Sequence, residues 1–179
     1  MPLFIAAFDI ATQTGCADGH ANGKPRAWTW NLAKAGKGRP HRLAYLRDYA
    51  DRYFAETQPD CVFYERGLGL AAAMEIGMSD DTMALLRGAI GVLEASAAKA
   101  KIPHIQPVGV QEARRYLLGA GRIPKGEGKA LVRERCRMMA WPVANDDEAD
   151  ATCIWAYGCG QTSPAMAAMT TPLFARRQG

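Results

Sequence analysis

Two short apolar runs in this chain each end in an acidic residue, and this repeated pattern constrains the fold more than any other feature. The first run, residues 3–8, ends at Asp9, and the second, residues 61–64, ends at Glu65. Both have the length and composition of buried β-strands. With a helix between them, the strands would be neighbours in one sheet and both acids would emerge at the same edge. A carboxylate there needs a partner, a metal ion or a neutral form, because its desolvation is costly.

A purely structural role for the first acid is the alternative at this point. Asp9 is followed by hydroxylated residues, and its carboxylate could cap the next turn while Thr12 and Thr14 share the hydrogen bonds. The local sequence does not distinguish a capping role for Asp9 from a chemical one, so other parts of the chain are needed to separate them.

The pattern around these strands predicts a single α/β domain over residues 1–161, because 179 residues suffice for one full core. Further strands are expected at 15–19, 24–30 and 102–106, and helices at 41–57, 80–101, 107–118 and 127–139. A last helix should begin at Asn145 or Asp146 and continue through residue 156. Residues 31–40 are expected to form a mobile loop, 67–79 a flexible segment with Met74 and Met78 in the core, and 162–179 an extended tail.

Positive charge is concentrated in two blocks of the sequence. Residues 20–47 contain seven Lys or Arg and no acid, and residues 111–137 contain eight against three acids, although the formal net charge is only +4. This asymmetry indicates an anionic partner on one face, and solvated basic helices without a partner are the alternative. Lys129, Arg133 and Arg137 recur at intervals of four, so they share one helical face.

Cysteine and hydropathy patterns point to a reducing compartment. The five cysteines show no C-x-x-C spacing, which favours buried free thiols, and the three histidines match no metal-ligand spacing. No stretch approaches the roughly 20 apolar residues of a membrane span, and the N-terminus lacks a signal pattern. We therefore expect a cytoplasmic protein without a membrane partner.

Acidic residues gather again at the start of the last predicted helix. Asp147 and Asp150 are three apart and project from one face, although Asp146 could replace Asp147 on that face. Acids at a helix N-terminus complement the macrodipole, which accounts for Asp146 and Glu148 but not for the deeper Asp150. Together with the two strand-end acids they could form a cluster of four carboxylates.

Such a cluster repels itself unless cations neutralise it, and oxygen-rich sites of this kind suit Mg²⁺ or Mn²⁺. Two ions roughly 3.5 to 4 Å apart can activate a water and stabilise the leaving oxygen of an in-line displacement at phosphorus. Basic blocks around an acidic centre then suggest that Lys and Arg hold a phosphate backbone on which the acids and metals act.

Four segments in this order resemble the RuvC-like Holliday-junction resolvases, particularly their phage-type relatives. They are FDIATQTGCA around Asp9, VFYE ending at Glu65, EARRYLLGAGRIPKGEGKALV, and DDEADATCIWAYG, and the resemblance extends from residue 3 to about 160. The family implies an RNase H-like fold with a five-stranded mixed sheet, a homodimer, and metal-dependent paired nicking of four-way DNA junctions. It further implies 5′-phosphate and 3′-hydroxyl products, and a bacterial cell or a phage-infected host.

The resemblance also implies roles for individual residues. The acids that match the family's catalytic and metal-binding tetrad are Asp9, Glu65, Asp147 and Asp150. Lys129 resembles the basic residue near the scissile phosphate, with Lys125 as the alternative, and Arg114 or Arg115 resembles a further backbone contact. The segment after Glu65 resembles the part that enters the junction centre. The DNA-binding residues expected on this basis are Arg66, Gly67, Leu68, Arg114, Arg115, Lys125, Lys129 and Arg133.

Three other functions compete with junction resolution. A nuclease of the same fold could act on RNA–DNA hybrids, forks or flaps. The stretch DIATQTG also resembles the first phosphate loop of sugar kinases and actin-like ATPases, but that architecture needs two such domains and this chain has the length of one. A non-catalytic junction-binding accessory protein is the third alternative, and four acids in matching positions would give it no advantage.

Overall fold

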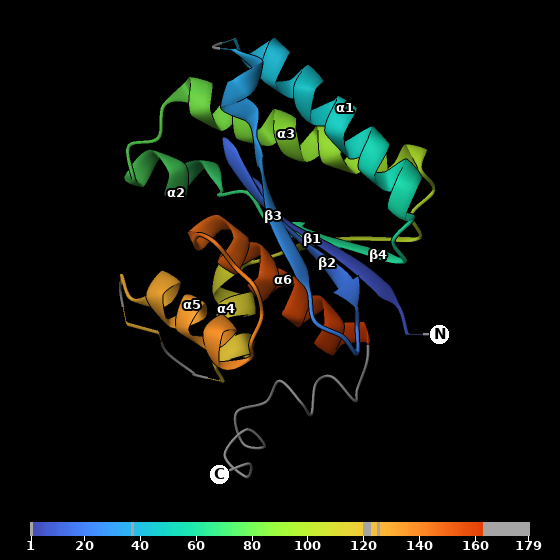
Figure 1. The fold of residues 1–179 in the computed structure, drawn as a ribbon. Helices are drawn as coiled ribbons and strands as arrows, with labels where there is room; N and C mark the ends of the chain where they lie inside the picture. The colour runs from blue at the N-terminus through green and yellow to red at the C-terminus, as the bar shows by residue number, and fades with distance from the viewer. Residues whose placement is uncertain (1, 37, 120–122, 125, 163–179) are drawn as a thin grey trace, which may run out of the picture.

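The central feature of the fold is a five-stranded mixed sheet (Figure 1). The computed structural model of the chain describes residues 2–36, 38–119, 123–124 and 126–162. Its strands are β1 (Phe4–Asp9), β2 (Gln13–His20), β3 (Arg26–Asn31), β4 (Cys61–Glu65) and β5 (His104–Val108), in the order β3-β2-β1-β4-β5. Strands β1 to β3 form an antiparallel meander, whereas β1, β4 and β5 are parallel. The predicted mixed sheet is confirmed.

Helices cover both faces of this sheet (Figure 1). One face carries α1 (Arg39–Thr57) and α3 (Asp80–Lys99), and the other carries α4 (Val110–Leu118), α5 (Gly128–Met138) and α6 (Asp146–Thr162). Strand β1 separates the two cores by alternation: Ala6 and Phe8 pack towards α1 and α3, while Ile5 and Ala7 pack towards α6. By the same alternation, Asp9 lies on the α6 side.

Helix α6 lies directly on the sheet and is buried from Glu148 to Cys159. A helix that is enclosed on all sides needs small residues where the backbone meets a neighbour. Gly158 meets this need, since a Cβ there would lie 2.5 Å from the ring of Phe63.

Two segments expected to lack structure form short helices instead. Within 31–40, a 3-10 turn covers Leu32–Ala35, because Asn31 accepts a hydrogen bond from the backbone of Ala33 and Leu32 is fully buried. Helix α1 then begins at Arg39, so the expectation of a mobile loop is wrong for these residues. Within 67–79, the alanine-rich run forms α2 (Leu70–Glu75), consistent with the high helix propensity of alanine.

Two expectations about core residues also need correction. Met74 is 66% exposed, because α2 lies at the surface, so it does not pack in the core. The sequence of the helix at 80–101 predicts a buried stripe of Leu86, Ile90, Leu93 and Ala97. In α3, Leu86 and Ile90 are only half-buried, and the neighbouring Leu85 and Ala89 face the core. The other two residues of the predicted stripe, Leu93 and Ala97, are fully buried as expected.

The expectations for the cysteines and histidines hold for the residues that the structure describes. All five cysteines are free and buried, and His20, His41 and His104 are exposed. Within the described ranges, the helices are all too short or too polar to cross a lipid bilayer. Helix α6 includes Thr162, one residue beyond the predicted domain boundary, and the expected tail at 163–179 lies outside the described residues.

The close packing of α6 predicts opposite effects for two glycine substitutions. Gly158→Ala should destabilise the protein by about 1–3 kcal/mol, because the new methyl group overpacks against the buried ring of Phe63. Gly91→Ala, on the exposed side of α3 with no atom within 4 Å of the new Cβ, should instead stabilise by about 0.5–1 kcal/mol. Chemical denaturation of both variants measures this. Equal effects of the two substitutions would contradict the packing described for α6.

Candidate active site

The two strand-end acids lie side by side at the carboxyl edge of the sheet. Strands β1 and β4 are parallel neighbours in which Phe8 pairs with Tyr64, so Asp9 and Glu65 are the next residues in register. Cys61 and Phe63 belong to the core under α6, and alternation therefore directs Glu65 to the same face as Asp9. Asp9 is only 7% exposed, and Glu65 is half-buried.

A capping network fixes the start of α6 beside these acids. The side chain of Asn145 accepts a hydrogen bond from the backbone N–H of Glu148 at 2.9 Å, as an N-cap residue does. The Glu148 carboxylate in turn accepts from the backbone of Ala144 at 2.7 Å and from the Thr29 hydroxyl at 3.2 Å. Glu148 is therefore a structural acid. The spacing N-x-x-E, close to a capping box, is the sequence signal that could have identified it.

Gly15 lets α6 approach the sheet next to Asp9. It pairs with Asp9 across β1 and β2, and a Cβ on it would lie 2.0 Å from the carbonyl oxygen of Asp147. Any side chain at this position would push the first turn of α6 away. Gly15 is thus a supporting residue that sequence reasoning missed, although its place six residues after Asp9 is visible in the sequence.

The deeper acid of α6 is held by two cationic side chains. Asp150 is 3% exposed and forms a buried ion pair with Arg114 of α4, with Nη2–Oδ2 at 2.8 Å. Lys129, at the start of α5, places its Nζ 3.8 Å from the same Oδ2 atom. Asp9, Asp150, Arg114 and Lys129 therefore belong to one electrostatic cluster.

The electrostatics of this cluster favour retention of a proton. Burial raises the pKa of Asp9 to about 9, assisted by a hydrogen bond to Glu65 and by the charges of Glu65 and Asp147, with Lys129 opposing. Burial also raises the pKa of Asp150, against the opposing effect of Arg114. At neutral pH the buried Asp9 carboxyl therefore favours its protonated form.

The donor atoms of this cluster suit divalent metal ions, but the acids do not lie close enough together to bind one as they stand. Its carboxylate oxygens are the donors that Mg²⁺ and Mn²⁺ prefer, and their mutual repulsion is the condition that a cation relieves. However, across the part of the chain that the structure describes, no three His, Cys, Asp or Glu side chains are gathered closely enough to hold an ion. The four acids would have to close in to bind one.

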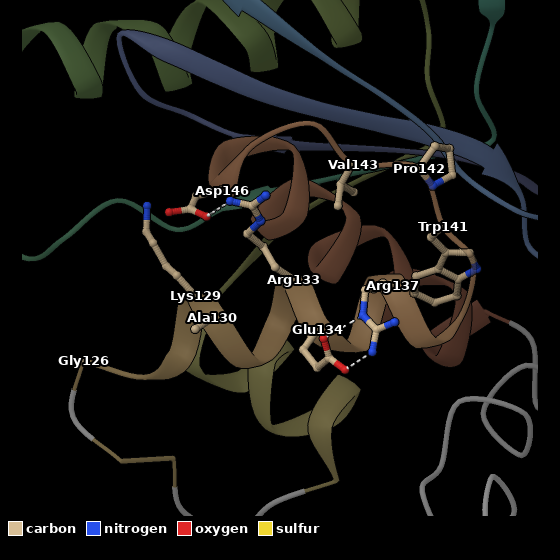
Figure 2. A pocket seen from close by; sticks show the side chains of 10 residues that line it. All are labelled: Gly126, Lys129, Ala130, Arg133, Glu134, Arg137, Trp141, Pro142, Val143 and Asp146. Carbon is tan, nitrogen blue, oxygen red and sulfur yellow. Dashed lines mark hydrogen bonds and ion pairs between the residues drawn. The ribbon is translucent and has the colours of Figure 1, made fainter.

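A basic hollow of about 870 Å³ adjoins the cluster between α5 and the segment that leads into α6 (Figure 2). Lys129, Arg133 and Arg137 project from α5 into it, as predicted from their spacing. Arg133 pairs with Asp146 at 3.4 Å, and Arg137 pairs with Glu134 at 2.5 Å. Asp146 therefore faces this hollow, whereas Asp147 is the neighbour whose charge acts on Asp9.

The remaining predicted contact residues are distributed around this edge. Arg115 is exposed and donates to the carbonyl oxygen of Gln111, in contrast to the partly buried Arg114. Arg66, Gly67 and Leu68 are exposed and directly follow Glu65. Lys125 lies outside the described residues.

The raised pKa of Asp9 predicts a specific pH dependence of the free energy of unfolding when a chelator removes metal ions. Below about pH 4, Asp9 is protonated in both the folded and the unfolded state; between about pH 4 and 9 only the folded state keeps the proton. The contribution of Asp9 to stability is therefore present at acid pH and is lost as the pH rises towards 9. Asp9→Asn, which stays neutral, should stabilise the metal-free protein at pH 8 by about 1–3 kcal/mol relative to the natural chain.

Denaturation of both proteins in chelator at pH 5, 6.5 and 8 measures this difference, which should grow with pH. Asp48→Asn serves as the matched control, because the Asp48 side chain is 64% exposed on α1 and far from the cluster along the chain. A difference for Asp9→Asn that stays constant or shrinks with pH would contradict the raised pKa of Asp9.

Comparison with known proteins identifies the fold. No protein-family model and no curated protein matches the sequence. Among solved structures, RuvC of Thermus thermophilus in complex with a Holliday junction substrate superposes with a TM-score of 0.64 at 19% identity, covering 94% of this chain and 97% of that one. A second T. thermophilus RuvC structure gives 0.62 at 15% identity, covering 97% of each chain. The yeast mitochondrial Holliday junction resolvase Ydc2 gives 0.56 at 12% identity, covering 96% of this chain and 83% of that one. The chain thus has the RNase H-like α/β fold of the RuvC resolvases over nearly its whole length, at low sequence identity.

Proposed function

We propose that this chain is a structure-selective DNA endonuclease that resolves four-way junctions by metal-dependent hydrolysis of phosphodiester bonds. One observation carries the proposal: acids from β1, β4 and α6 converge at one edge of a RuvC-like sheet, beside a basic helical face. A polyanion-binding surface gains nothing from buried acids unless cations join them. The combination therefore supports phosphate chemistry better than simple binding.

Asp9, Glu65, Asp147 and Asp150 are the residues that would hold Mg²⁺ or Mn²⁺, with two ions as the expected number. When bound, the ions supply an activated water and a counter-charge for the leaving 3′-oxygen, which leaves 5′-phosphate and 3′-hydroxyl ends. The proton that Asp9 retains would have to leave for its carboxylate to hold a cation, so metal binding should release a proton.

The basic face of α5 offers a path for the DNA backbone. Lys129, Arg133 and Arg137 are spaced by four residues, which corresponds to about 6 Å along the helix per step. Lys129 sits next to Asp150 and is the proposed contact to the scissile phosphate. Arg133 and Arg137 are the proposed contacts to the following phosphates, which would replace the carboxylates of Asp146 and Glu134 as their partners.

The exposed segment after β4 provides the proposed contact to the junction centre. Arg66 supplies charge, Gly67 allows close backbone approach, and Leu68, which is 49% exposed, supplies an apolar surface for unstacked bases. Symmetric paired nicks require two copies of the site, and we therefore include a homodimer in the proposal.

A junction-binding protein without catalysis is the second candidate, and one observation favours it. Arg114 already neutralises Asp150, so the cluster is partly satisfied without a metal ion. In that case DNA would be bound but never cut.

Cleavage of a labelled synthetic four-way junction tests the proposal. Symmetric nicks that require Mg²⁺ or Mn²⁺ and are absent from a linear duplex of the same sequence are the expected result. Asp9→Asn should lower the cleavage rate at least about 100-fold without weakening junction binding. Binding without cleavage in either metal would favour the accessory role, and preferential cleavage of an RNA–DNA hybrid, fork or flap would reassign the substrate.

The identity of the third acid gives a separate prediction. Asp147→Asn should reduce cleavage at least about 100-fold, because the charge of Asp147 acts on Asp9. Asp146→Asn should keep cleavage within about threefold and bind the junction more tightly, because it releases Arg133 from its ion pair. Rates at saturating metal and affinities in Ca²⁺ separate the two. The reverse pattern would make Asp146 the third acid.

A further inference from the structure

The contact between Arg114 and Asp150 is more constrained than an ordinary ion pair. Arg114 Nε donates to Oδ1 of Asp150 at 3.1 Å, and Nη2 donates to Oδ1 and to Oδ2, each at 2.8 Å. The side chains are 12% and 4% exposed, respectively. A planar guanidinium that makes three donations from within the protein fixes both the position and the rotation of the carboxylate.

The contact with Arg114 uses the two carboxylate oxygens of Asp150 unequally: Oδ1 accepts two hydrogen bonds and Oδ2 accepts one. A carboxylate oxygen has about two acceptor positions, and Oδ1 uses both for Arg114. Oδ2 accepts one donation and lies 3.8 Å from Lys129 Nζ. Oδ2 is therefore the oxygen on the side of Lys129, and it keeps an acceptor position that Arg114 does not use.

Helix α5 is built to accommodate this arrangement. Its first residue is Gly128, and a Cβ there would lie 2.9 Å from Arg114 Nη1. The guanidinium therefore packs directly against the turn that carries Lys129. A side chain at position 128 would displace either Arg114 or the start of the basic helix.

We propose that Arg114 is a positioning residue for Asp150: it occupies Oδ1 and leaves Oδ2 as the one oxygen offered to a divalent cation. This inference rests on the proposed nuclease function and replaces the expectation from family resemblance that Arg114 contacts the DNA backbone. Arg115, its exposed neighbour, is the better candidate for that contact.

Arg114→Ala and Arg115→Ala form a matched pair, because each removes one positive charge from adjacent positions of α4. Junction affinity is measured in Ca²⁺ over a range of salt concentrations. Arg114→Ala should leave the affinity within about twofold and the salt slope unchanged, whereas Arg115→Ala should reduce the salt slope by about 1. A reduced slope for Arg114→Ala would make Arg114 a phosphate contact and overturn the proposal.

Metal binding provides the second readout. Calorimetric titration of the DNA-free protein with Mn²⁺ should show tighter binding by Arg114→Ala, by about three- to tenfold, because a competing cation is lost and Oδ1 is freed. Cleavage at saturating Mn²⁺ should nevertheless fall at least about tenfold, because Asp150 is no longer oriented. Unchanged or weaker Mn²⁺ binding would contradict the competition between Arg114 and the metal.

Arg114→Lys keeps the test decisive if the alanine variant does not fold. Lysine preserves the charge but cannot make the two-pronged contact, so cleavage should remain low if Arg114 positions Asp150 and should be retained if it contacts phosphate. If the natural chain cuts no junction, the proposed function fails, and the Mn²⁺ titration still decides the role of Arg114. Absence of Mn²⁺ binding by the natural chain would overturn both.

Discussion

The structure depends on a carboxyl group that is kept almost out of water at the end of its central strand. Asp9 lies beside Glu65 and opposite Gly15, and burial together with these neighbours makes its negative charge unfavourable. Three features offset this cost: the proton that Asp9 retains, the positive charge of Lys129, and the ion pair between Asp150 and Arg114. The cluster is therefore partly neutralised by the chain itself, and a divalent cation would relieve the repulsion that remains.

Helix α6 links this cluster to the stability of the domain. Its first turn is fixed by Asn145, Glu148 and Thr29 of the edge strand, and its middle forms the core against the sheet. The backbone that carries the acids of α6 thus cannot move without disturbing the core, so only their side chains can turn towards an ion. The basic face of α5 is more exposed and its arginines are paired with surface carboxylates, so this part can exchange partners.

The strands and the pairing of Asp9 with Glu65 could be predicted from the sequence, whereas the side-chain contacts between helices could not. The boundaries of β4 were predicted to the residue, because Pro59 and Gly67 bracket an apolar run that ends in an acid. The helical turn at Leu32 was missed, since its burial depends on distant residues that no local pattern reveals. Arg114 and Asp150 are 36 residues apart in the sequence, and their ion pair joins α4 to α6. No local pattern in either helix predicts this contact. Asp146 and Asp147 were indistinguishable by helical periodicity, and it is the capped start of α6 that separates their surroundings.

Crystals soaked in Mn²⁺ would test most directly whether the acids at this edge form a metal centre, because the anomalous signal locates the ion without reference to activity. We expect Mn²⁺ between Asp9 and Glu65, with Asp150 contributing Oδ2 while Arg114 keeps its hold on Oδ1. An edge that stays free of Mn²⁺ at millimolar concentration, with the ion pair of Arg114 and Asp150 unchanged, would contradict a catalytic role for the cluster and leave the chain as a junction-binding protein.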